Sequence, residues 1–233
     1  MTATRTQARF FDAGFFTFLT QLARHNDREW FQAHKDQYES EVRDPMLRFI
    51  AALDAPLRKL APRFVADPSP VGGSMMRIYR DIRFARDKSP YKTAVAAHFG
   101  YEGKKGEGAP AFYLHLAPGR CSVGAGIWRP EPPIVRKIRD HIAGDPKTWR
   151  RVTSRTAFGS SCGMVGESLK RVPAGYDPDS PIAEDLKRRD FAISAPLADR
   201  TVAGPAMLDT VVEAYRGFSP FVRFLCEAVG LRY

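Results

Sequence analysis

The stretch from Arg77 to Lys92, RIYRDIRFARDKSPYK, has the composition of an anion-binding segment. Its six cationic residues and two carboxylates leave a local charge of +4. Guanidinium groups bind phosphate or carboxylate through two parallel hydrogen bonds, and aromatic rings beside them can brace the cations or stack on a ligand. From this stretch we take the following as ligand-binding candidates: Arg77, Tyr79, Arg83, Lys88, Tyr91 and Lys92.

Arg80 has a different expected role, because strand alternation assigns it to a core position. A buried charge without a partner is very costly, so Arg80 needs a carboxylate nearby. Asp81 and Asp87 are the candidates. We therefore predict a structural ion pair that braces the turn before Pro90, in preference to direct ligand contact by Arg80.

His98 and His115 occupy matching positions in two predicted strands. Histidine titrates near neutral pH, so the two side chains suit proton transfer as a catalytic pair. Hydrogen-bonding histidines in a polar cavity are the alternative reading. A metal site normally needs a third ligand, and Asp81 is the one carboxylate expected on the same face, so we predict neither a metal nor a cofactor.

Strand-like alternation appears after the Pro- and Gly-rich segment 67–73, with turn residues at intervals that favour an antiparallel meander. The predicted strands are Met75–Phe84, Ala94–Tyr101, Ala111–Ala117 and Arg120–Trp128, with a possible edge strand at Asp190–Leu197. One face is apolar. The other carries the candidate Arg, His and Tyr side chains, with Tyr113 and Trp128 as walls, among Ala, Gly and Ser. Two readings stay open: a binding pocket, or close packing of helices on small residues.

Helical periodicity and caps predict the elements on either side of the sheet. They are Ala13–Arg24, Asp27–Val42 behind an Asn26 capping box, a helix beginning at Asp44, then Pro132–Ala143, Pro146–Thr153 and Gly204–Val229. We expect an α+β fold, with an antiparallel sheet of four to five strands packed by N-terminal and C-terminal helices. It should form a single domain over residues 11–233 behind a disordered segment 1–10.

The net charge of +10 and isoelectric point of about 9.7 make nucleic acid an alternative partner. Three widely spaced cysteines, Cys121, Cys162 and Cys226, are expected to be free thiols. No stretch reaches the eighteen apolar residues that a membrane span needs, so we predict a cytoplasmic protein without membrane contact.

Two motif matches are weaker. Gly159–Gly163 fits G-x-S-x-G, but no buried strand precedes it, so Ser161 is a poor candidate nucleophile. The Gly-rich segment from Gly100 to Gly108 contains Lys104 and Lys105 and suggests a mobile hairpin tip or a basic lid.

Several of these segments together resemble a widespread bacterial and fungal family of conserved hypothetical proteins, a domain of unknown function. The runs are FFTFLTQLARHNDREWFQAHKDQYE, RIYRDIRFARDKSPYK, FYLHLAPG, GAGIWRPEP, RVPAGYDP and DFAIS, covering about Phe15 to Arg223. The resemblance implies no activity. It draws attention to Arg77, Arg80, Asp81, Arg83, Phe84, Asp87, Lys88, Pro90, Tyr91, Lys92 and His115. Many relatives carry a polar residue where this chain has Ala94, which weighs against enzyme readings.

The leading functional expectation is binding of an anionic, phosphate-bearing small ligand in a basic and aromatic pocket. Nucleic-acid binding by the same cations and aromatic residues is the first alternative. A protein-interaction scaffold that uses Trp30, Phe31 and the basic surface is the second. The oligomeric state is not predicted.

Overall fold

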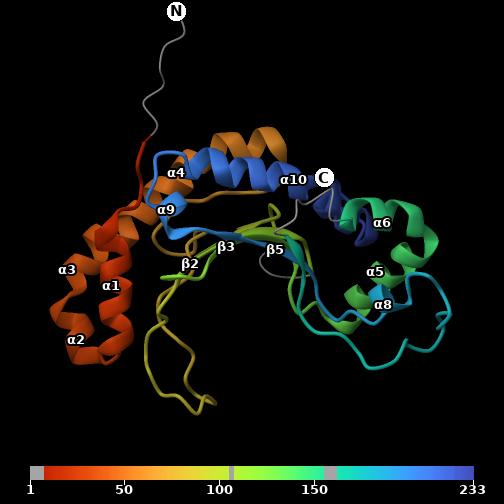
Figure 1. Cartoon of the computed structure of the whole chain (residues 1–233), viewed down its shortest axis with the longest axis horizontal. Helices are drawn as coiled ribbons and strands as arrows, with labels where there is room; N and C mark the ends of the chain where they lie inside the picture. Colours follow the sequence, from red (N-terminus) through yellow and green to blue (C-terminus); the bar gives the residue numbers. More distant parts are fainter. Residues whose placement is uncertain (1–7, 105–107, 155–161) are drawn as a thin grey trace, which may run out of the picture.

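A five-stranded antiparallel sheet forms the centre of the computed structural model, which describes residues 8–104, 108–154 and 162–233. The strand order is β1-β2-β3-β5-β4. The strands are β1 (Val95–Gly100), β2 (Ala111–Leu116), β3 (Cys121–Ile127), β4 (Gly163–Val165) and β5 (Phe191–Leu197). Helices flank this sheet, and the α+β class predicted from the sequence is confirmed (Figure 1).

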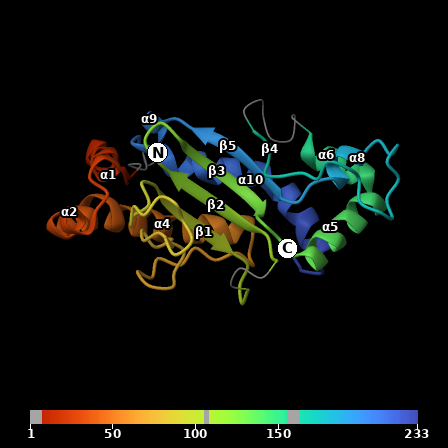
Figure 2. The same ribbon diagram turned by 90° about the horizontal axis from the view of Figure 1, so that it is seen from below.

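The helices fall into groups before and after the first three strands. The first group is α1 (Ala13–Arg24), α2 (Arg28–Ala33), α3 (Lys35–Tyr38), the π-helix η1 (Glu39–Arg43) and α4 (Asp44–Leu60). The second is α5 (Pro132–Gly144), α6 (Pro146–Thr153), α8 (Ala183–Leu186), α9 (Asp199–Val202) and α10 (Met207–Ala228). Figures 1 and 2 show α4 and α10 side by side along one face of the sheet.

The core lies between this face and the two long helices. Strand alternation turns one set of apolar side chains toward the helices, as the sequence pattern predicts. Tyr215 of α10 packs on Phe99 and Phe112, with ring centroids 6.1 and 4.8 Å apart. All three side chains are fully buried or nearly so, and this packing fixes which face of the sheet stays open.

The predicted strand Met75–Phe84 is wrong. Within it, only Met75 and Tyr79 make bridges, to Ala97 and Tyr91 respectively, and no continuous ladder forms. The chain instead leaves the sheet and folds back on itself as a loop of residues 77–92, the basic loop. Figure 1 shows this loop in yellow, projecting from the sheet on the side opposite α4 and α10.

Two further boundaries differ from the sequence prediction. The helix expected over Asp27–Val42 is divided into α2, α3 and η1, and its cap is the side chain of Asp27, which accepts a hydrogen bond from the Trp30 N–H at 2.8 Å. The predicted edge strand is β5, but β4 pairs with its outer side and makes it an inner strand. The predicted disordered segment 1–10 lies outside the described residues for its first seven positions.

Candidate functional site

The open face of the sheet presents rows of side chains that the strand register aligns. One row runs from His98 through Tyr113 and Gly124 to Ser194. The neighbouring row places His115 opposite Ser122. Large polar residues therefore stand on β1 and β2, whereas small residues cover β3 and β5.

A cavity of about 1120 Å³ occupies this face, and we call it the concave cavity. Its lining includes His98, Tyr113, His115, Ser122, Trp128, Arg129 and Ser194. In the described part of the chain, no helix covers this face, as Figure 2 shows from below, and the start of α5 reaches the cavity through Pro133 and Ile134. Helices packed on small residues, the second reading of this face, therefore do not account for it. The cavity volume lies slightly above the usual range of small-molecule sites, about 300 to 1,000 Å³.

Gly124 and Gly126 form the floor of the concave cavity, and the packing of β3 against β5 requires glycine at both positions. A Cβ atom at Gly124 would lie 2.8 Å from the backbone oxygen of Ile193, and one at Gly126 would lie 2.1 Å from that of Phe191. Gly126 also has a φ of +130°, which other residues rarely adopt. Close approach of β3 to β5 thus requires glycine, and the bare cavity floor is a consequence.

Both candidate histidines are biased toward their neutral forms. The pKa of His98 is lowered from its usual value by burial, although the side chain keeps contact with solvent. The pKa of His115 is lowered by burial first and by the nearby cation Arg120 second. At neutral pH each imidazole therefore has one ring nitrogen free to accept a hydrogen bond or a proton.

Tyr113 and Trp128 supply aromatic surface to the same cavity. The ring of Tyr113 lies 6.3 Å from that of His115 at an interplanar angle of 27°. Burial raises the pKa of Tyr113, so its hydroxyl stays protonated and can donate. Trp128 is 57% exposed, which leaves much of its indole available to a ligand.

Arg129 follows Trp128 in the cavity lining and has an unusual backbone conformation. Its φ of 48° is the one positive value among non-glycine residues in the described part of the chain. The backbone N–H of Arg129 donates to the carboxylate of Asp190 at 2.7 Å, and that of Glu167 donates to the same carboxylate at 2.8 Å. Asp190 is only 3% exposed, so a buried carboxylate holds the strained residue in place.

The basic loop lies outside the concave cavity. None of its ligand-binding candidates, Arg77, Tyr79, Arg83, Lys88, Tyr91 and Lys92, is among the residues that line it. The expected shared face of Arg77, Tyr79 and Arg83 with the histidines is wrong, because no strand forms there. His98, Tyr113 and His115, by contrast, do line one cavity.

Several cations of the basic loop are bound within the loop itself. The guanidinium of Arg83 binds Asp81 through two hydrogen bonds of 2.9 and 2.7 Å, which lower the pKa of that carboxyl. The ammonium groups of Lys88 and Lys92 donate to backbone carbonyls of the same loop at 3.0 and 2.8 Å. For Arg77 and Arg86, in contrast, we find no side-chain hydrogen bond or ion pair to another described residue.

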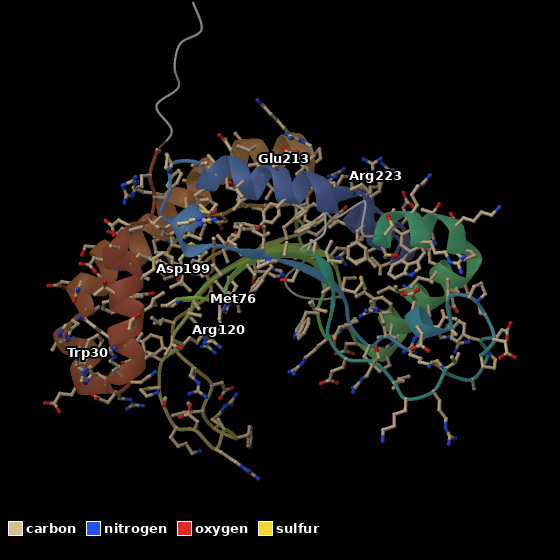
Figure 3. All side chains as sticks on the ribbon, in the orientation of Figure 1. Trp30, Met76, Arg120, Asp199, Glu213 and Arg223 are labelled. Carbon is tan, nitrogen blue, oxygen red and sulfur yellow. The ribbon has the colours of Figure 1, made fainter. Side chains whose placement is uncertain are left out.

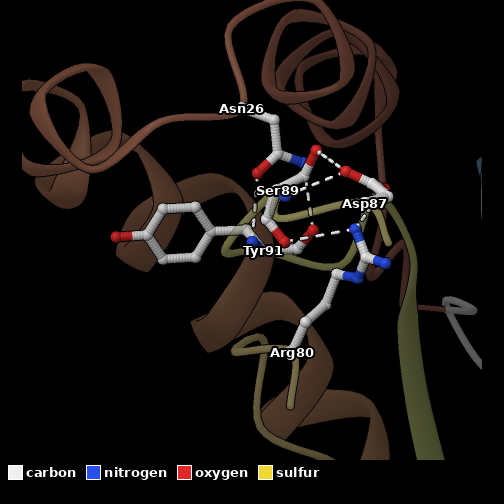
Figure 4. Close-up of polar contacts among 5 residues, drawn as sticks. All are labelled: Asn26, Arg80, Asp87, Ser89 and Tyr91. Atoms are coloured by element: carbon white, nitrogen blue, oxygen red, sulfur yellow. Dashed lines mark hydrogen bonds and ion pairs between the residues drawn. The ribbon is translucent and has the colours of Figure 1, made fainter. Parts of the chain in front are cut away.

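Arg80 pairs with Asp87, one of its two expected partners, while Asp81 binds Arg83 (Figure 4). The Arg80 side chain is 28% exposed, so it is less buried than expected. Asp87 also accepts hydrogen bonds from the backbone N–H and the hydroxyl of Ser89, at 2.9 and 2.6 Å. These hydrogen bonds, more than Arg80, lower the pKa of Asp87.

Asn26 attaches the basic loop to the helices. Its side-chain amide donates to the Tyr91 carbonyl and its side-chain oxygen accepts from the Tyr91 N–H, both at 3.0 Å. Figure 4 shows Asn26 beside this turn. The ring of Tyr91 stacks on Phe31 at 4.1 Å, and both are buried, so neither is free to bind a ligand or protein partner in this conformation.

Sequence reasoning missed four residues of this region: Asn26, Arg120, Arg129 and Asp190. Figure 3 labels Arg120 and Met76 on the open side of the sheet, away from Glu213 and Arg223 on α10. Arg120 and Arg129 flank β3 in the sequence. Their nearness to candidate residues of this strand is the sequence signal that could have identified them. Asn26 is the one asparagine in the chain, but it was assigned to a helix cap.

The other candidate residues form no second functional site within the described residues. Among the described residues, no group of three or more His, Cys, Asp and Glu is arranged to hold a metal ion. Cys121, Cys162 and Cys226 are free and buried. Ser161 and Lys105 lie outside the described residues. Within the described ranges, no helix is both long and apolar enough to cross a membrane.

Comparison with known proteins gives the chain a family. No curated protein and no solved structure matches it. A family model described as a conserved hypothetical protein (DUF2461) matches residues 14–224, which is nearly the whole chain. The chain with this open, histidine-lined sheet therefore belongs to the DUF2461 family of conserved hypothetical proteins.

Proposed function

We propose that the concave cavity binds a small organic ligand carrying an anionic group of the phosphate type. The observation that carries this proposal is the composition of one cavity of about 1120 Å³, which combines a bare floor, two neutral-biased histidines, an exposed indole and a guanidinium. Pockets that bind small molecules have this mixture of apolar surface and a few directed polar groups.

Each part of the cavity has a proposed role. The floor around Gly124 accepts a flat organic group, and Trp128 stacks against it. Tyr113 donates a hydrogen bond. Glu167 pairs with Arg189, and Arg129 forms no ion pair with a described residue, so we assign its guanidinium to the anionic group of the ligand.

His115 and His98 are the proposed proton-transfer pair of this site. A general base must be unprotonated before it can accept a proton, and the lowered pKa values of both imidazoles favour that form at neutral pH. Because they lie diagonally across β1 and β2, one ligand can contact both. We assign no reaction to them.

A paired ligand screen tests this proposal. Each phosphorylated metabolite is compared with its dephosphorylated form by thermal shift, at constant ionic strength. A ligand at a hundred times its dissociation constant stabilises a protein by about 2.7 kcal/mol. We expect stabilisation by a phosphorylated compound, and its loss in Ser122→Trp, which places an indole on the cavity floor opposite His115. Ser40→Trp, on the exposed surface of η1, is the matched control. A hit that binds Ser122→Trp as tightly as the wild type contradicts the proposal.

Single-stranded nucleic acid is a second candidate ligand, and one observation favours it. Phe84 in the basic loop is 96% exposed, with the guanidinium of Arg83 6.0 Å from its ring centroid. Exposed aromatics beside cations bind bases by stacking and phosphates by charge. We expect only weak binding that disappears at physiological salt. Tight binding there, lost in Phe84→Ala, would make nucleic acid the better candidate.

A further inference from the structure

A second cavity, of about 520 Å³, adjoins the concave cavity near the start of α5, and we call it the arginine cavity. Arg129 and Pro130 line both cavities. The other lining residues are Pro132, Val135, Arg139, Glu167, Leu169, Arg189 and Asp190.

Some of the arginine residues that line the arginine cavity have no carboxylate partner among the described residues. Glu167 forms an ion pair with Arg189, at 3.0 Å. Asp190 is buried and already accepts two backbone N–H groups. Neither carboxylate forms an ion pair with Arg129 or Arg139. Two arginine residues, Arg129 and Arg139, thus line one cavity without an ion-pair partner among the described residues.

Arg139 is the more unusual of the two, because it is partly buried. Its Nη2 donates to the Arg188 carbonyl at 2.8 Å, but its buried Nε has no hydrogen-bond partner among the described residues. Burial also lowers the pKa of Arg139. A partly buried cation without a counter-ion is less well solvated than an exposed one, and an anion bound in the cavity would offset that loss.

We propose that the arginine cavity is an oxyanion site, in which Arg129 and Arg139 bind the phosphate group of the ligand. The organic part of the ligand then lies in the concave cavity, since Arg129 belongs to both. Phosphate oxygens accept charge-assisted hydrogen bonds from guanidinium groups, often two at a time. The placement of the organic part depends on the proposed function, whereas the phosphate site is inferred from the arginine cavity alone.

Inorganic phosphate is the direct probe of this site. The full chain is titrated with phosphate at constant ionic strength, with chloride as the balancing anion, and the thermal midpoint is followed. We expect saturable stabilisation of the wild type. Replacing one charge-assisted contact typically weakens binding about tenfold or more, so Arg139→Gln should shift the phosphate titration by at least that factor.

Arg136→Gln is the matched control, because Arg136 lies one turn earlier on α5 and its side chain is 83% exposed. It should titrate like the wild type. Arg129→Gly removes the other arginine of the site. Because Arg129 is exposed, this variant tests the site even when Arg139→Gln does not fold. Absence of phosphate stabilisation in the wild type, or equal stabilisation in Arg139→Gln and Arg129→Gly, overturns the oxyanion site.

A second arm of the experiment distinguishes a phosphorylated organic ligand from free phosphate. For a phosphorylated hit from the screen, Arg139→Gln should remove the preference over the dephosphorylated form. Phosphate binding that depends on Arg139 without any organic hit would support a site for free phosphate and count against the concave cavity as a ligand site. The two proposals therefore fail in distinguishable ways.

Discussion

Arg129 combines a strained backbone with a side chain that lines both cavities. A non-glycine residue in the left-handed region costs about 1 to 3 kcal/mol and persists where the surroundings enforce it. Here the Asp190 carboxylate does so, by accepting the Arg129 N–H at 2.7 Å. Such strain is common at functional sites, which is why we give Arg129 the central binding role.

Substitutions of Arg129 should therefore change the stability of the protein and its phosphate binding in different directions. Arg129→Gly keeps the hydrogen bond to Asp190 and relieves the backbone, so its melting temperature should equal or exceed that of the wild type, while phosphate binding falls. Arg129→Val, with a β-branched side chain, should melt lower than both. Thermal melts of the three proteins measure this, and a Gly variant several degrees less stable than the wild type would refute the strain.

The histidines predict a dependence of stability on pH. The folded pKa values of His98 and His115 are lowered, so on acidification the unfolded chain takes up protons before the folded chain does. Stability is then fully present above the unfolded pKa of about 6.5 and is lost as the pH falls from there through the folded values. Melting temperatures measured at fixed ionic strength between about pH 5.5 and 7.5 should show this decline.

The His98→Gln/His115→Gln double variant should show a flatter pH profile over the same range. If its slope equals that of the wild type, the pKa values of the two imidazoles are not lowered in the folded protein.

At the scale of elements, Asn26 has the clearest mechanical role. Its amide pairs with both backbone polar groups of Tyr91, as a neighbouring strand would. Two hydrogen bonds at about 1 kcal/mol each predict that Asn26→Ala destabilises the fold by about 2 kcal/mol. Amide hydrogen exchange at Tyr91 should accelerate most. Gln32→Ala, on the exposed surface of α2, is the control and should change neither quantity.

The tip of the basic loop should be neutral for stability. Phe84 is 96% exposed, and substitutions at such positions usually change stability by no more than about 0.5 kcal/mol. Denaturant unfolding of Phe84→Ala should give the wild-type midpoint. A clear loss of stability would mean that the loop packs against the body of the protein in solution.

Elements with strong periodicity could be predicted from the sequence, and those held by distant contacts could not. Helix α1 matches its predicted bounds because Phe15, Phe18, Leu19 and Leu22 share one buried face. The segment 75–84 has apolar alternation too, but after Met75 it folds back and pairs with residues 90–92 of its own loop, which the distant Asn26 side chain binds at Tyr91. Alternation alone does not indicate that the segment pairs within its own loop instead of extending the sheet.

The same limit applies to the candidate site. His98, Tyr113 and His115 could be placed on one face because their strands are regular and pair in register. Arg129 and Asp190 could not be joined, since they are 61 residues apart and meet through a backbone N–H. Charge density in the basic loop is the strongest signal in the sequence, yet several of those cations bind carboxylates and backbone carbonyls of the same loop.

At the scale of the whole molecule, two regions that contribute to the net charge of +10 differ in character. The basic loop projects from the open side of the sheet, and several of its cations are bound internally (Figure 1). The arginine cavity lies at the start of α5 and contains guanidinium groups without a carboxylate partner among the described residues. An unpaired cation inside a cavity is a stronger indication of an anionic ligand than a larger number of paired cations on a loop.

The structure of a complex with a phosphorylated ligand from the screen tests this account most directly. We predict that the organic part lies over the floor at Gly124, beside His115 and Trp128, and that the phosphate oxygens lie within hydrogen-bond distance of Arg129 and Arg139. A ligand bound only to the basic loop, with both cavities empty, would contradict the central claim.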